Sequence, residues 1–154
     1  MTLVTDRKDL DTTLKSDGQQ TDYLVLSEEE RAKGFVRPVR TSYKHVGIAG
    51  PVHPLRDLSE EEQVRYKHSG YVKFEIYPTN QYPTIGRYWT QEQFDKVGKG
   101  CGVVTKMGQA LAETYSRNPR FYGSTFCVGC GTHLPVGDEG EFVWQDDSGT
   151  RVGT

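Results

Sequence analysis

Hydrophobic and polar positions alternate most regularly from Tyr71 to Tyr77, where apolar residues occupy every second position. Because successive side chains of a strand point to opposite faces of a sheet, this period predicts a half-buried β-strand. Weaker strand patterns cover residues 35–46 and 121–126. Residues 134–136 and 141–144 flank a Gly-rich turn, so we expect them to pair as a C-terminal hairpin.

Helices are indicated where a Ser or Thr stands three residues before a Glu or Gln, the capping-box pattern. Such boxes begin at Ser27, Ser59 and Thr90 and predict three short helices. A longer amphipathic helix is expected from about Thr105 to the Asn118-Pro119 pair, because proline disfavours helical backbone in the residue before it. Short strands mixed with short helices predict a small α+β domain.

The two ends of the chain differ in composition from its middle. Residues 1–22 are polar and show no hydrophobic period, so we expect a flexible N-terminal tail. Residues 146–154 are also polar and predict a flexible C-terminal end. A single α+β domain is therefore expected over residues 23–145.

Composition limits the size of the core and the class of protein. The 154 residues are only 34% hydrophobic, and small domains with thin cores often depend on a bound metal. No apolar run approaches the ~18 residues of a membrane span, so no membrane association is expected. The net charge of −2 argues against a globally basic protein that coats nucleic acid, although a local basic patch is compatible with it.

The strongest chemical signal is the segment Cys127-Val128-Gly129-Cys130-Gly131. Two thiolates three positions apart on a tight turn can chelate one tetrahedral metal ion, and the glycine after them permits positive φ. The Cys101-Gly102 pair repeats the Cys-Gly element and adds a third thiolate. Three cysteines cannot form a closed disulfide framework, so we expect a structural zinc ion instead.

A structural zinc site closes with a fourth ligand, for which the chain offers four histidines. His45 is favoured because it lies where a predicted strand runs into a glycine-containing bend, and because structural sites usually join distant chain segments. His133 follows Cys130 so closely that it would join less of the chain. His53, His68 or a group other than histidine remain alternatives.

Two catalytic uses of a Cys-x-x-Cys motif fit this chain less well. In a thioredoxin-like dithiol the motif opens a helix, whereas Gly131 and Pro135 follow it here. In a zinc deaminase a His-x-Glu supplies a ligand and the general acid/base, and this chain contains no His-x-Glu. No catalytic residue is assigned, and a metal-dependent enzyme is the less favoured alternative to a non-catalytic module.

Three segments together resemble small zinc-finger-like proteins encoded by bacteriophages of actinobacteria, a likeness that covers roughly residues 34–153. They are Arg37-Pro38-Val39-Arg40-Thr41-Ser42-Tyr43-Lys44-His45, the stretch from Cys101-Gly102 to Tyr115, and the stretch from Asn118-Pro119 to Leu134-Pro135-Val136. The resemblance implies His45, Cys101, Cys127 and Cys130 as the ligand set, a phage origin and action in the host cytoplasm. This chain departs from the family by an insertion at residues 49–98. The family has no established activity, so the resemblance implies a metal and not a reaction.

Charge and aromatic residues suggest two kinds of macromolecular partner. From Arg31 to Arg56 the chain has no acidic residue, and Arg37, Arg40 and Lys44 are candidates for contact with a nucleic-acid backbone. The same pattern is also typical of solvated strand edges. The insertion is rich in Tyr and Trp, which can serve a protein interface or simply form its core. The partner is accordingly a host or phage nucleic acid or protein.

Overall fold

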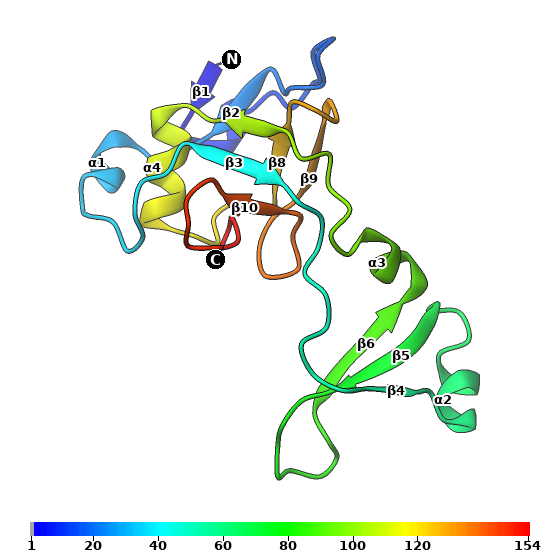
Figure 1. Ribbon diagram of the computed structural model, residues 1–154. Coiled ribbons are helices and arrows are strands. Elements are labelled where there is room, and N and C mark those ends of the chain that lie inside the picture. Colours follow the sequence, from blue (N-terminus) through cyan, green and yellow to red (C-terminus); the bar gives the residue numbers. More distant parts are fainter. Residues whose placement is uncertain (1) are drawn as a thin grey trace. The chain divides into compact units, whose positions relative to one another are not determined.

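The computed structural model describes residues 2–154 (Figure 1). Short strands and a few short helices make up the chain, which confirms the α+β class. The chain divides into two compact units. Unit 1 contains the residues up to Gly47 and those from Gly100 to Thr154, and unit 2 contains Ile48–Lys99. The expectation of one domain over residues 23–145 is therefore corrected, because the insertion expected at 49–98 folds as a unit of its own.

Unit 1 is built from three small groups of strands and two α-helices. A short 3-10 helix, Arg7–Asp9, lies near its N-terminal end. None of the helices within residues 2–154 has the length and apolar content needed to cross a membrane. The elements of unit 1 are β1 (Thr2–Val4), β2 (Asp22–Leu24), α1 (Glu28–Arg31), β3 (Ser42–His45), β7 (Val104–Lys106), α4 (Gln109–Arg117), β8 (Ser124–Cys127), β9 (Thr132–Pro135) and β10 (Phe142–Trp144).

Strand β3 lies at the centre of the main sheet of unit 1, between the antiparallel strands β10 and β7. Strands β8 and β9 form a separate hairpin. The expected C-terminal hairpin is therefore wrong, since β9 pairs with β8 and β10 pairs with β3. The turn at residues 137–140 connects two sheets, because a hydrophobic pattern indicates that a strand exists and not which strand it pairs with.

The helix caps of the sequence are present, but the long helix starts later than expected. Ser27, Ser59 and Thr90 each accept a backbone hydrogen bond at the start of a helix. Helix α4 begins at Gln109, since Thr105 belongs to β7 and is paired with Tyr43 of β3. Sheet pairing has thus taken the first turn that the helical period suggested.

Both ends of the chain are ordered, which corrects the two flexible tails. Strand β1 pairs in parallel with β2, and the amide of Asp11 donates to the carboxylate of Asp22. At the other end, Val152 is fully buried and its amide donates to the carbonyl of Phe142. Backbone hydrogen bonds hold these segments, and such bonds leave no hydrophobic period in the sequence.

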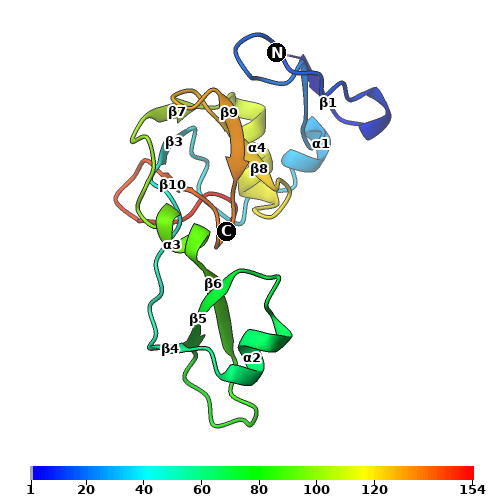
Figure 2. The ribbon, with the colours of Figure 1, turned by 90° about the vertical axis from the view of Figure 1, so that its right-hand side faces the viewer.

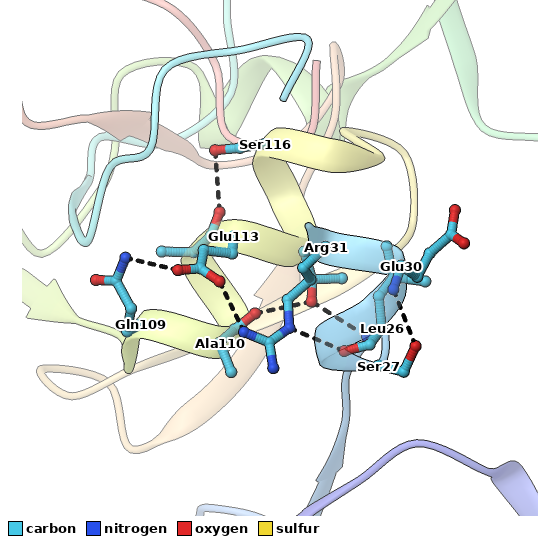
Figure 3. A network of polar contacts seen from close by, with 10 residues as sticks. Leu26, Ser27, Glu30, Arg31, Gln109, Ala110, Glu113 and Ser116 are labelled. Carbon is cyan, nitrogen blue, oxygen red and sulfur yellow. Dashed lines mark hydrogen bonds and ion pairs between the residues drawn. The ribbon is translucent and has the colours of Figure 1, made fainter. Parts of the chain in front are cut away.

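The core of unit 1 is largely aromatic. Tyr43 contacts Phe142 and Trp144 edge to face, with ring centroids 5.3 and 6.4 Å apart. Helices α1 and α4 are joined by an ion pair of 2.7 Å between Arg31 and Glu113, and the same guanidinium donates to the carbonyl of Leu26 (Figure 3). The buried residues of this core are Tyr43, Tyr115, Cys127, Phe142, Trp144 and Val152.

Unit 2 has a core of its own around a three-stranded sheet (Figure 2). Trp89 is fully buried and stacks on Phe94, and its indole N–H donates to the buried carboxylate of Glu75 over 2.8 Å. Most of the aromatic residues of the insertion therefore serve packing. The elements of unit 2 are β4 (Leu55–Asp57), α2 (Glu60–Arg65), β5 (Tyr71–Ile76), β6 (Gly86–Thr90) and α3 (Gln91–Lys96), and the strand order is β4-β5-β6.

Candidate metal centre

Four side chains with metal-ligating atoms meet in unit 1. His45, Cys101, Cys127 and Cys130 each offer one ligand atom, and these four atoms all lie within 4.8 Å of one another. His45 ends β3, Cys101 lies in the loop before β7, and the other two cysteines flank the turn between β8 and β9. The group can hold a metal ion, and its ligands come from three separate segments of the chain.

The distances within the cluster suit one tetrahedral ion. Cys101 Sγ lies 3.5 Å from Cys127 Sγ, and Cys130 Sγ lies 3.5 Å from Nδ1 of His45. In a tetrahedral zinc site with bonds of ~2.3 Å to sulfur and ~2.0 Å to nitrogen, the corresponding edges are about 3.8 and 3.5 Å. A disulfide needs ~2.05 Å between sulfurs, and the three cysteines are free.

His45 is held with one ring nitrogen facing the thiols. The amide of Cys101 donates to Nδ1 over 3.1 Å, so Nδ1 acts as the acceptor and Nε2 carries the hydrogen. Nε2 lies 2.9 Å from Oε1 of Glu141. Burial by itself lowers the pKa of His45, but the hydrogen bonds to Glu141 and Cys101 outweigh it and raise that pKa. Sequence reasoning missed Glu141 as a partner of the site.

The backbone around the cysteines is shaped by glycines. Gly102 and Gly131 each follow a cysteine and have φ of +75° and +66°, which side chains rarely allow. The amide of Gly131 donates to the carbonyl of Cys127 over 2.8 Å, and that of Gly102 donates to the carbonyl of His45 over 2.9 Å. The Cys-Gly pairs singled out in the sequence therefore turn the chain as that motif predicts.

Two further glycines leave no room for a side chain. A Cβ on Gly100 would lie 2.2 Å from the carbonyl oxygen of His45, and one on Gly129 would lie 2.8 Å from Sγ of Cys101. The loop before β7 thus packs directly on the end of β3, and the Cys127–Cys130 turn packs directly on Cys101. Close approach of the three segments brings the ligand atoms together.

The thiols affect each other's protonation. Burial raises the pKa of Cys130 to about 12, together with its contacts to Cys127 and Cys101. Burial also acts to raise the pKa of Cys101, but a hydrogen bond from the backbone of Val103 and the contact with His45 lower it to about 7. Three thiolates so close together repel one another, and a divalent cation would remove that repulsion.

The remaining histidines lie outside the cluster. Nε2 of His133 is hydrogen bonded to the hydroxyl of Tyr23 over 2.8 Å, and burial lowers the pKa of His133. His53 and His68 belong to unit 2. Among the candidates for the fourth ligand, only His45 has a ring nitrogen in the thiol group of the described chain.

The expected basic stripe is divided between several local interactions. Arg40 has a side chain only 15% exposed, paired with Asp146 over 3.0 Å and lying over the ring of Trp144. Arg31 is paired within unit 1, and Arg56 is paired with Glu62 in unit 2. Arg37 and Lys44 are exposed. Of the three proposed phosphate contacts, the structure places Arg40 in the packing of unit 1 and the other two on its surface.

Comparison of this chain with protein family models, with curated proteins and with solved structures found no match. The assignment of His45, Cys101, Cys127 and Cys130 as candidate metal ligands therefore rests on their geometry.

Proposed function

We propose that the four-residue cluster is a structural zinc site and that the chain is a non-catalytic binding module which this zinc stabilises. The observation that carries the proposal is the convergence of three thiols and one imidazole within 4.8 Å. Thiolate and imidazole ligands together favour zinc, and four protein ligands fill a tetrahedral shell. No coordination position is then left for a substrate or a catalytic water.

Zinc at this position would join β3, the loop before β7 and the β8–β9 hairpin. Unit 1 has a core of only six buried residues in its main cluster, so such a crosslink adds a substantial share of its stability. Because the ligands come from distant segments, binding free energy becomes folding free energy. The metal in this proposal is part of the architecture and takes no part in a reaction.

Elemental analysis of the purified chain tests the metal. We expect one zinc per chain in the wild type, loss of zinc with a lower Tm in His45→Ala, and retention of zinc in His133→Ala. His133 is a matched control because it is a partly buried histidine in the same unit. A chain without stoichiometric zinc, or a His45→Ala variant that binds it as tightly as wild type, contradicts the proposal.

For the partner, we propose a protein that docks on the β5–β6 connection of unit 2. Tyr82 is 97% exposed and Ile85 is 50% exposed in that connection, beside a groove that is also lined by Ile76 and Pro83. Exposed aromatic and aliphatic side chains beside a groove are what protein interfaces bury. The phage origin and the host cytoplasm, which the resemblance implies, belong to this proposal.

Nucleic-acid binding is the alternative and is separated by its salt dependence. We expect no binding of a 20-base-pair DNA, of its single strands or of RNA at low salt. Binding whose log–log salt slope falls in the Arg37→Ala/Lys44→Ala variant, by roughly 0.7–0.9 per lost phosphate contact, would instead favour nucleic acid. For a protein partner, Tyr82→Ala should weaken capture from a host lysate, while Val64→Ala, on the exposed side of α2, should not.

A further inference from the structure

A cavity of about 230 Å³ in unit 1 is not part of the metal centre. Its walls come from β3, β7, α4 and β8, and none of the four candidate metal ligands lines it. Among the described residues, its lining includes no acidic side chain. The apolar part of the wall is formed mainly by Tyr43, Met107, Leu111, Tyr115, Tyr122 and Phe126.

One buried hydroxyl in this wall has no partner. Tyr115 is only 4% exposed, and within residues 2–154 its hydroxyl oxygen makes no hydrogen bond. Buried hydroxyls are nearly always hydrogen bonded in folded proteins. The unpaired hydroxyl of Tyr115 therefore indicates that a partner from outside the chain completes the site.

The neighbouring hydroxyls are already engaged. Thr125 donates to the hydroxyl oxygen of Tyr43 over 3.2 Å, and Tyr43 in turn donates to the carbonyl of Phe126. Tyr122 donates to the carbonyl of Leu24 over 2.6 Å. Tyr115 is the remaining donor among these three tyrosines of the wall.

The hydroxyl of Tyr115 is on the cavity side of its ring. The groups that act on its ionisation are Thr125, Tyr122 and Tyr43, and all of them line the cavity. Burial raises the pKa of Tyr115, so it is a neutral donor at every pH at which the protein is folded. A ligand would have to present an acceptor to it.

We propose that this cavity binds a compact, uncharged aromatic molecule whose hydrogen-bond acceptor pairs with the hydroxyl of Tyr115. Aromatic walls favour a ring, and the lack of an acidic lining residue together with a neutral donor favours an uncharged acceptor such as a carbonyl. Cavities of about 150 Å³ already hold benzene, so this one has room for a ring with one small substituent. The site is independent of the bound metal and of the surface of unit 2.

Acetophenone and α-methylstyrene are matched probes, because they have nearly the same planar shape and only acetophenone has a carbonyl. Titration of the full-length protein, followed by amide NMR shifts, should show acetophenone perturbing residues 105–111 and 124–126. We expect α-methylstyrene to bind about fivefold more weakly, which corresponds to one neutral hydrogen bond. The Tyr115→Phe variant should bind both probes with equal affinity.

The Tyr115→Phe variant keeps the ring and removes a hydroxyl without a partner, so its Tm should equal or exceed that of the wild type. Ser124→Trp, at an exposed position of the wall, should block both probes while the Tm is retained. Absence of binding at millimolar concentration, or equal affinity of wild type for both probes, overturns the proposal. The latter result would mean that only water pairs with Tyr115.

Discussion

Oε1 of Glu141 lies 2.9 Å from Nε2 of His45, and both residues are buried. The same glutamate accepts the amides of Val46 and Gly47 at its carbonyl oxygen, so its backbone and side chain both bind the end of β3. A carboxylate on the outer nitrogen of a ligating histidine fixes the tautomer and the ring orientation, and it makes the inner nitrogen more basic.

Glu141→Gln should weaken zinc binding by about 10-fold or more, because an amide orients the imidazole less strongly than a carboxylate does. Competition against a chromophoric chelator measures the dissociation constant. Asp138→Asn is the control, since Asp138 is exposed and pairs only weakly with Arg120 over 3.4 Å. Equal zinc affinity in wild type and Glu141→Gln would show that this contact is structural only.

Gly100→Ala should destabilise unit 1 by about 1–3 kcal/mol, because its Cβ would meet the His45 carbonyl oxygen at 2.2 Å. Urea unfolding of the zinc-loaded chain measures this free energy. Gly123→Ala is the matched control, since a Cβ there has no atom within 4 Å and its φ is not in the positive range. A shift of the same size in both variants would contradict the close packing at Gly100.

Arg40→Ala should lower the free energy of unfolding by about 1 kcal/mol, since the substitution removes a half-shielded ion pair and a contact with Trp144. Arg37→Ala should change it by less than about 0.5 kcal/mol, because Arg37 is exposed. Thermal unfolding of the two variants in parallel makes the comparison. Identical melts would mean that Arg40 is as free for a partner as Arg37.

The stability of unit 2 should depend on the ionisation of Glu62. Hydrogen bonds from Arg56, then from Tyr88 and the Ser59 amide, hold the pKa of Glu62 well below its usual range. A carboxyl whose pKa is lowered on folding stabilises the fold when it is ionised, so this contribution is present above pH ~4.5 and is lost as the pH falls. Contact with Glu62 raises the pKa of Tyr88 to about 12, so the contribution of Tyr88 is present below pH ~10 and is lost toward pH 12.

Amide hydrogen exchange in β5 and β6 measures this effect within unit 2, apart from the metal cluster. The protection lost in Glu62→Gln relative to wild type should be largest near pH 6 and should shrink below pH 4. Glu61→Gln is the control, because Glu61 is exposed and pairs only with Arg65 along the same helix. A difference between wild type and Glu62→Gln that does not change with pH would contradict the assigned ionisation.

The ligand set could be predicted because its signals are local. The spacing of Cys127 and Cys130, the repeated Cys-Gly element at Cys101, and the strand-to-bend position of His45 are all visible in the sequence. Glu141 could not be found in this way. It reaches His45 only because Phe142 of β10 is the register partner of His45, and that pairing joins positions 97 residues apart in the chain.

The same limit explains the errors in the fold. The period of two identified β5, but nothing local indicated that β10 joins β3 or that β1 pairs with β2. In the insertion, aromatic density could not separate Trp89, which is fully buried, from Tyr82, which is almost fully exposed. That distinction depends on the position of each residue in the sheet and its loops.

The chain leaves unit 1 and returns to it beside the same residue, since the amide of Gly102 donates to the carbonyl of His45. At the other side of these crossings, the amide of Gly98 donates to the carbonyl of Ile48. Residues 48–99 thus form a cassette with adjoining ends. The entropy of closing a loop rises only slowly with its length, so a gene can gain, lose or exchange such a cassette while the ligands on either side of it keep their positions.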